Sequence, residues 1–309
     1  MVDRPLIALT GATGFVGRAL LQELVKQSLP VKALARMQPR RQLANELDVE
    51  WIAGDLSSSA ALTSLVKGAD TVIHLAGATK ARNASAFHQV NALSTAELVR
   101  RAEAAGVRHF VHVSSLTAQR PDVSAYAQSK AASERLAAEN AGAMALTIIR
   151  APAVLGPGDD ATQSLFAALA RGILPIPGGV AGGFRFSAID VADAARFLAG
   201  LATGAASGMR MIAPAGHLNL GWIDVAQSAE RVLQRPVRQI VIPPALMKVA
   251  GQGADLAVKL NGKPQVFSGG KVKELFSGDW LADTQVPDAL PLDTTLERCL
   301  APFLRSDRG

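Results

Sequence analysis

Short apolar runs alternate with helical periodicity along the first half of the chain. Between the runs, apolar residues recur three or four positions apart, as at Val16, Leu20 and Leu24, which predicts amphipathic helices. The runs themselves predict strands at residues 6–9, 31–35, 49–53, 71–75, 110–113 and 146–150. Strands that alternate with helices join through right-handed crossovers. We therefore expect an α/β fold, a doubly wound parallel sheet of the Rossmann type.

The pattern changes after residue 150. A Gly- and Asp-containing loop is followed by a helix at 162–171 and a stretch rich in proline and glycine at 173–183. A strand, a helix and a last strand are then expected to return to the sheet, at residues 184–189, 191–201 and 209–212. This predicts a dinucleotide-binding domain of residues 1–150 with a returning segment at about 184–213.

The remaining residues, 151–183 and 214–309, are expected to form a smaller, mostly helical substrate lobe. Amphipathic helices are predicted there at residues 223–233, 245–260 and 296–304. Lys248 and Lys259 in the second of these helices allow it to lie on a membrane surface. Because its polar face is not strongly basic, we favour burial in the lobe or a contact in a homodimer.

Three glycines separate the first predicted strand from the first helix. Gly11 can adopt backbone angles that a Cβ forbids, Gly14 lets a phosphate approach the main chain, and Gly17 lets the helix lie close to the strand. The N–H groups of such a turn and the positive end of the helix dipole favour a pyrophosphate. The G-x-x-G-x-x-G spacing is therefore interpreted as a dinucleotide-binding turn.

Residues at the ends of the next strands indicate which dinucleotide is bound. Arg36 follows the second strand, where arginine suits the 2′-phosphate of NADP and an acidic residue would suit NAD. Arg40 and Arg41 follow closely. Asp55, after the third strand, can cap the next helix or lie against the adenine. His74, near the end of the fourth strand, is expected to be a packed histidine.

The composition argues against several other classes of protein and site. The hydrophobic fraction is 49% and the net charge is +6, but the Lys and Arg residues are scattered and aromatic residues are few, which argues against nucleic acid as a partner. Cys299 is the single cysteine, so no intramolecular disulfide and no cysteine-rich metal site are expected. No pattern typical of a signal peptide or a membrane-spanning segment is found. A cytoplasmic protein that acts on a small molecule is expected.

Tyr126 and Lys130 lie four residues apart and project from one face of a predicted helix. An ordinary phenol has a pKa near 10, and a nearby ammonium lowers it by stabilising the phenolate. Tyr126 is thereby expected to serve as a proton donor and acceptor. Ser115, at the end of the fifth strand, can hydrogen-bond a substrate hydroxyl or carbonyl oxygen, although Ser114 and Thr117 are alternatives.

Several segments together resemble the extended short-chain dehydrogenases, the NAD(P)-dependent epimerase/dehydratase family. The segments are residues 10–17 (TGATGFVG), 54–56 (GDL), 74–77 (HLAG), 113–115 (VSS), Tyr126-x-x-x-Lys130 and 150–157 (RAPAVLGP). The resemblance implies that Tyr126 is the acid/base, that Lys130 binds the nicotinamide ribose and that Ser115 orients the substrate oxygen. It also implies the following cofactor-binding residues: Gly11, Thr13, Gly14, Phe15, Gly17, Arg36, Asp55, Leu56, Ala76, Gly77, Lys130 and Pro152.

The sequence thus predicts an oxidoreductase that moves hydride between NADP, or alternatively NAD, and a carbon bearing a hydroxyl or carbonyl group. A nucleotide-sugar epimerase or dehydratase is the first alternative, and a non-catalytic NADP-binding subunit is the second. In the resembled family, nucleotide-sugar enzymes carry an arginine at the position that Phe186 holds here. Arg185 is one residue off, so we expect it to turn away from the cleft and an aromatic ring to face a mainly apolar substrate.

Overall fold

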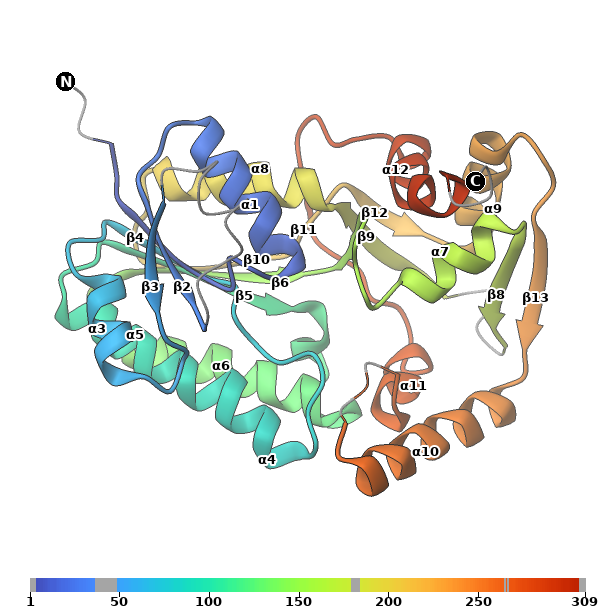
Figure 1. The fold of residues 1–309 in the computed structure, drawn as a ribbon, viewed down its shortest axis with the longest axis horizontal. Coiled ribbons are helices and arrows are strands. Elements are labelled where there is room, and N and C mark those ends of the chain that lie inside the picture. The colour runs from blue at the N-terminus through green and yellow to red at the C-terminus, as the bar shows by residue number, and fades with distance from the viewer. Residues whose placement is uncertain (1–3, 37–48, 179–183, 264, 266, 306–309) are drawn as a thin grey trace.

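A seven-stranded parallel sheet organises the first half of the molecule (Figure 1). The computed structural model describes residues 4–36, 49–178, 184–263, 265 and 267–305. In spatial order the strands of the sheet are β10 (Met209–Ile212), β6 (Ala145–Ala151), β5 (His109–Ser115), β4 (Thr71–His74), β1 (Ile7–Thr10), β2 (Val31–Ala35) and β3 (Val49–Ala53). The chain order reverses between β1 and β4. Ligands of doubly wound sheets bind outside the strand ends at such a point.

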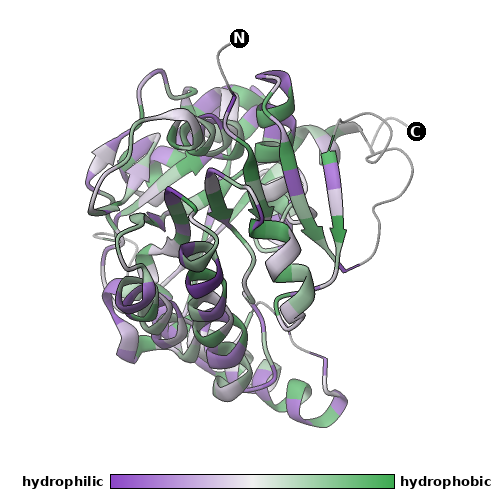
Figure 2. Ribbon diagram, turned by 90° about the vertical axis from the view of Figure 1, so that its left-hand side faces the viewer, coloured by the Kyte–Doolittle hydropathy of each residue, from purple (hydrophilic) through white to green (hydrophobic). Residues whose placement is uncertain are grey.

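Helices cover both faces of this sheet, so the expected doubly wound fold is confirmed (Figure 1). On one face α1 (Phe15–Lys26) packs against α8 (Val191–Thr203). On the other face lie α3 (Ser59–Val66), α5 (Ser94–Ala104) and α6 (Ala125–Asn140). Central strand residues such as Ile7 and Leu9 are fully buried. In Figure 2 the central strands are mostly green, whereas the covering helices alternate between green and purple.

The segment between β4 and α5 is not one continuous α-helix, although its apolar residues recur at helical spacing. A short helix, α4 (Ala84–Phe87), runs into a π-helical turn at His88–Leu93 before α5 begins. The wider turn places Asn91 on the buried side, where it is 1% exposed. Turns of this kind are frequent at functional sites.

The predicted return to the sheet needs one correction. A strand forms at β9 (Phe186–Asp190), but it pairs with β7 (Ala153–Leu155) and β12 (His217–Leu220) in a separate three-stranded sheet. Only α8 and β10 rejoin the large parallel sheet. The apolar pattern of residues 184–189 predicts a strand and not its partner, because strand pairing is decided by tertiary contacts.

The lobe is mostly helical, as predicted, and also contains several short strands. Besides the three-stranded sheet it has two parallel pairs, β8 (Ile173–Pro177) with β13 (Arg238–Ile242) and β11 (Pro214–Ala215) with β14 (Thr284–Gln285). Its helices are α7 (Gln163–Ala170), α9 (Trp222–Leu233), α10 (Pro244–Asn261), α11 (Gly269–Leu275) and α12 (Leu292–Arg305). The helices α7, α9 and α12 share a hydrophobic core that contains Phe166, Leu169 and Leu300.

Helix α10 is not buried in the lobe, contrary to one of the two arrangements that we favoured. Met247 and Gly251 are its buried residues, whereas most of its large apolar side chains face solvent. Figure 1 shows the helix along the lower edge of the lobe. Within the described part of the chain, none of the helices combines the length and apolarity that crossing a membrane requires.

Candidate active site

The glycine turn after β1 has the close contacts that its sequence predicted. Gly11 has a φ of +76°, a conformation that side-chain-bearing residues rarely adopt. A Cβ on Gly17 would lie 1.9 Å from the carbonyl oxygen of Gly11, so only glycine lets α1 start this close to the turn. Gly14 is the N-cap of α1 without a capping side chain, and the first turn has no acidic residue. This cradle fits the pyrophosphate of a dinucleotide.

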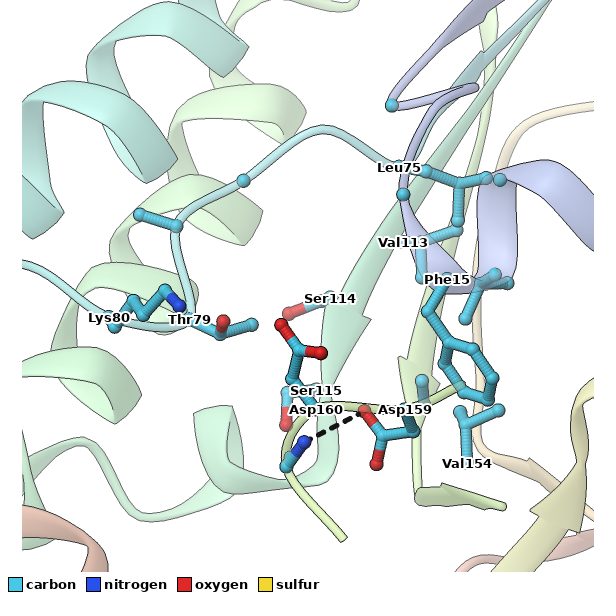
Figure 3. Close-up of a pocket in the computed structure, with 18 of the residues that line it drawn as sticks. Phe15, Leu75, Thr79, Lys80, Val113, Ser114, Ser115, Val154, Asp159 and Asp160 are labelled. Carbon is cyan, nitrogen blue, oxygen red and sulfur yellow. Dashed lines mark hydrogen bonds between the residues drawn. The ribbon is translucent and has the colours of Figure 1, made fainter. Parts of the chain in front are cut away.

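A cavity of about 550 Å³ lies between the glycine turn, the end of β5 and helix α6 (Figure 3). Of the candidate residues from the sequence, those that line it are Gly11, Thr13, Gly14, Phe15, Gly17, Gly77, Ser114, Ser115, Tyr126, Lys130 and Pro152. The structure thus brings the glycine turn and the candidate catalytic residues into one cavity. This is the arrangement that a dinucleotide stretched across the switch point of the sheet requires.

Four candidate cofactor residues lie outside the cavity lining. Ala76 packs under the glycine turn, where its N–H donates to Thr10 Oγ1 at 3.2 Å. Arg36 and Asp55 follow the neighbouring strands β2 and β3. The pKa of Asp55 is lowered mainly by its hydrogen bonds to Ser57, and the Arg36 charge is a smaller cause. Leu56 follows Asp55. Arg40 and Arg41 lie outside the described residues.

Asp55 is bonded locally and does not itself cap α3. Its carboxylate accepts hydrogen bonds from the N–H and Oγ of Ser57, at 2.8 and 2.6 Å. The N-cap of α3 is Ser58, whose Oγ accepts from the N–H of Ala61. The Asp55 carboxylate nevertheless stays on the exposed edge of the strand ends, where an adenine group is expected in this fold.

Two elements place the catalytic candidates. Tyr126 and Lys130 lie one turn apart on α6, and Ser115 ends β5. The Lys130 ammonium donates to the carbonyl oxygen of Val113 at 2.8 Å, and the Tyr126 phenol is hydrogen-bonded to Ser115. The ring of Phe87 lies edge-on to that of Tyr126, with centroids 5.9 Å apart. The phenol is thus held between a hydroxyl and an apolar ring.

Burial dominates the proton affinities of this group. It raises the pKa of Tyr126 to about 12, although the hydrogen bond from Ser115 opposes the shift. It lowers the pKa of Lys130 to about 8, against the attraction of Glu134. The lowering of the Tyr126 pKa by Lys130 that the sequence suggested is therefore not found. The physical reason is that the ammonium is directed at the Val113 carbonyl, while desolvation disfavours a phenolate.

The hydroxyl that orients a substrate oxygen still has three candidates. Ser115 Oγ accepts hydrogen bonds from the N–H and the Oγ1 of Thr117, at 3.2 and 3.0 Å. Ser114 Oγ is buried and has no hydrogen-bond partner among the described residues. Ser114 and Ser115 both line the cavity. Ser115 is the one in contact with Tyr126.

His74 is a packed residue, as expected. Its ring nitrogens are hydrogen-bonded to Thr10 Oγ1 at 2.7 Å and to Thr95 Oγ1 at 2.9 Å, and the ring stacks on His112 with centroids 5.5 Å apart. Burial, followed by the repulsion of Lys130, lowers the pKa of His74 to about 3. His74 stays neutral, and each of its ring nitrogens takes part in a hydrogen bond. It therefore stabilises the ends of β1 and β4 and is not a proton donor in catalysis.

Asn91 is a site residue that sequence reasoning missed. Its amide oxygen accepts from Ala78 N at 2.7 Å, and its amide nitrogen donates to Ala78 O at 3.0 Å and Ser129 Oγ at 2.9 Å. Ser129 Oγ in turn donates to the carbonyl oxygen of Tyr126. Asn91 therefore ties the loop after β4 to the catalytic helix. The sequence signal for its role was an asparagine at a position where the helical pattern places apolar residues.

Charged residues of the cavity were also missed. Lys80, from the loop after β4, and Asp159 and Asp160, from the loop before α7, line it together with Thr79 (Figure 3). Asp159 is engaged with the start of α7, because its carboxylate accepts hydrogen bonds from Ala161 and Thr162. Loop residues of this kind show no helical or strand periodicity in the sequence. Whether they reach the cavity depends on how the lobe packs against the large sheet.

Phe186 and Arg185 lie in the lobe, and neither lines the cavity. The Arg185 guanidinium pairs with Asp224 of α9 at 3.1 Å. Phe186 packs between Phe184 and Trp222, with ring centroids 5.8 and 5.4 Å away. The aromatic ring that we expected in the cleft therefore belongs to an aromatic cluster of the lobe.

The fold and the cavity define a dinucleotide-dependent enzyme of the short-chain dehydrogenase class. Residues 7–208 match the family model described as the NAD dependent epimerase/dehydratase family. The chain belongs to this family and is an NAD(P)-dependent enzyme of the extended short-chain type, an oxidoreductase or an epimerase. The resemblance seen in the sequence is confirmed.

Several relatives are reductases. The chain is 36% identical to a ceramide reductase of Caulobacter vibrioides, over 90% of this chain and 86% of the relative. It is 33% identical to a 2-alkyl-3-oxoalkanoate reductase of Stenotrophomonas maltophilia, over 65% and 67% of the two chains. Among solved structures, MoeE5 in complex with UDP-glucuronic acid and NAD is similar over 98% of this chain and 99% of its own, with 22% identity and a TM-score of 0.69. That likeness concerns the fold.

Proposed function

We propose that this protein is an NADP-dependent reductase of a ketone carried by a mainly apolar, long-chain molecule. The observation that carries the proposal is the meeting of Ser115, Tyr126 and Lys130 with the glycine turn in one cavity. A protein that only binds the cofactor does not need a buried phenol beside a serine and a lysine. The reductive direction is supported by the names of the two reductase relatives.

The chain's own residues have separate tasks in this mechanism. The N–H groups after Gly14 hold the pyrophosphate at the start of α1, and Lys130 reaches the ribose next to the nicotinamide. Ser115 donates to the substrate carbonyl oxygen and fixes its position beside Tyr126. NADPH, when bound, supplies the hydride that adds to the carbonyl carbon. As the C=O double bond becomes single, Tyr126 gives its phenolic proton to the oxygen, so that an alcohol leaves the site.

Two observations support an apolar substrate. Two of the relatives are a ceramide reductase and a 2-alkyl-3-oxoalkanoate reductase, which are named for a lipid and for an alkyl-substituted oxoalkanoate. The arginine nearest to the position that binds a sugar diphosphate in nucleotide-sugar enzymes, Arg185, is paired with Asp224. A diphosphate would have to compete with that carboxylate for the guanidinium.

The test is NADPH oxidation by the purified protein with a long-chain 3-oxoalkanoate, compared with UDP-sugars. Tyr126→Phe should lower kcat by about 10² to 10⁴-fold, because it removes one proton-transfer group and keeps the ring. NADPH affinity should stay within a factor of about two, since the phenol oxygen is not a phosphate ligand. Near-normal turnover in this variant would refute the role of Tyr126. Turnover of a UDP-sugar in place of the ketone would favour the epimerase or dehydratase alternative.

A further inference from the structure

Helix α10 presents an apolar stripe to solvent, which we call its outer face. The outer face consists of Leu246, Val249, Leu256 and Leu260, which are 59%, 64%, 56% and 80% exposed. These positions follow one another at helical spacing, with Gly253 in the gap, so they form one continuous side of the helix. Apolar side chains exposed singly are common, but a stripe along four turns of one helix marks an interaction surface.

Packing on the opposite side fixes the orientation of the helix. A Cβ on Gly251 would lie 3.0 Å from Val272 Cγ2 and 3.1 Å from Gly269 Cα, so α10 and α11 are as close as a glycine permits. The Asp255 carboxylate also accepts a hydrogen bond from Gly269 N at 3.2 Å. Helix α10 cannot roll to bury the outer face without losing these contacts.

The charges around the outer face suit an anionic surface. Residues 240–274 contain five lysines and two carboxylates, those of Asp255 and Glu274, and Glu274 pairs with Lys271 at 3.0 Å; the lysines are Lys248, Lys259, Lys263, Lys271 and Lys273. Lys248 and Lys259 are exposed on the helix itself. Lysines beside an apolar stripe are typical of helices that lie in the headgroup region of anionic bilayers. A two-fold contact between copies through α10 would instead bring the lysines of both chains together.

Helix α10 is also joined to the walls of the cavity. Arg82 Nε, from the loop after β4, donates to the carbonyl oxygen of Gly262 at the end of α10, at 3.1 Å. Residues 77–80 of the same loop line the cavity. On the other side, Glu274 of α11 accepts a 2.6 Å hydrogen bond from Ser124, the N-cap of the catalytic helix. Hydrogen bonds therefore link the end of α10 to the loop that lines the cavity, and the adjoining α11 to the start of α6.

We infer that the outer face of α10 docks on an anionic lipid bilayer and holds the cavity next to the membrane, where a long-chain substrate resides. The inference rests in part on the proposed function, since a lipid-like substrate gives the docking its use. It commits to peripheral attachment, with the apolar side chains in the headgroup region and the lysines against anionic lipid.

Vesicle sedimentation of the full chain tests the inference. The protein should sediment with vesicles of phosphatidylcholine mixed with phosphatidylglycerol and less with phosphatidylcholine alone, because the lysines add an electrostatic attraction. Val249→Glu combined with Leu256→Glu should weaken binding by about tenfold or more. Met209→Glu is the matched control, because Met209 on β10 is as exposed as Val249, at 64%. Circular dichroism and thermal melting show whether the variants fold.

Several results would overturn the inference. One is vesicle binding by the double variant equal to that of the unmodified protein. Another is no binding to either vesicle, together with a dimer in size-exclusion chromatography that the double variant abolishes, which would make α10 a contact between copies. Ketone reduction without vesicle binding refutes the docking alone, and vesicle binding without reduction of any ketone refutes the proposed function alone. In the supporting case, the double variant keeps its rate on a short, water-soluble ketone and loses rate on a long-chain ketone held in vesicles.

Discussion

Gly17→Ala tests whether the glycine turn is shaped by close packing or only by the flexibility of glycine. The added Cβ would lie 1.9 Å from Gly11 O, 2.7 Å from Gly11 C and 2.9 Å from Ala12 Cα. All three are backbone atoms, so no side chain can rotate away. Ordinary van der Waals contact begins at 3.4 Å, so the start of α1 and the turn must separate by roughly 1.5 Å.

The separation has two measurable consequences. Overpacking of this kind costs about 1 to 3 kcal/mol of the free energy of unfolding, which lowers Tm by a few degrees in a chain of this size. The shift also misplaces the N–H groups that meet the pyrophosphate. A hydrogen bond to a charged group contributes about 1.5 to 3 kcal/mol, so the loss of one raises the Kd for NADPH about tenfold or more.

Gly200→Ala is the control for the substitution itself. Gly200 lies inside α8, and a Cβ there would have nothing within 4 Å. Because alanine favours a helix over glycine, this variant should gain about 0.5 to 1 kcal/mol of the free energy of unfolding and bind NADPH normally. Thermal denaturation and calorimetric titration of NADPH measure both quantities. A Gly17→Ala protein with the Tm and Kd of the unmodified protein would refute the packing argument.

Three further predictions concern the cofactor, the substrate and the buried histidines. Arg36→Ala should raise the Kd for NADPH about tenfold or more and leave that for NADH unchanged, whereas equal affinities in the unmodified protein would contradict a 2′-phosphate contact. Titration with UDP should show no micromolar binding; such binding, if abolished by Arg185→Ala, would indicate a nucleotide-sugar site. Between pH 7 and 5 the unfolded chain protonates at His74 while the folded chain stays neutral until about pH 3, so the free energy of unfolding should fall by up to about 2 kcal/mol. His74→Gln should reduce this slope.

Much of the cofactor half could be predicted because its signals are local. The apolar runs at residues 31–35 and 49–53 coincide with β2 and β3 to the residue. Gly14 and Gly17 mark the turn because the contacts they permit lie within ten residues, as in the approach of Gly17 to Gly11, whereas Gly11 also comes close to Leu75 and Ala76. Tyr126 and Lys130 share a helix face by spacing alone. Each of these inferences needs only neighbouring residues.

The features that could not be predicted depend on distant contacts. The partner strands of β9 are chosen by the packing of the lobe, which its alternating side chains do not encode. The π-helical turn forms where Asn91 can bond both Ala78 and Ser129, residues of two other segments. The pKa of Tyr126 rises because the folded chain removes water from the phenol, a loss that the presence of Lys130 four residues away does not show.

The catalytic helix is held in place by a segment to which the sequence assigned no role. Arg120, in the short span between Ser115 and Tyr126, donates to the carbonyl oxygens of Ser277 at 2.7 Å and Asp279 at 2.8 Å. Its guanidinium also lies 4.5 Å from the ring centroid of Trp280. These contacts, like the one between Ser124 and Glu274, join the catalytic residues to α11 and the chain that follows it. Because α11 also packs against α10, these contacts link the segment that carries Ser115 and Tyr126 to both of these lobe helices.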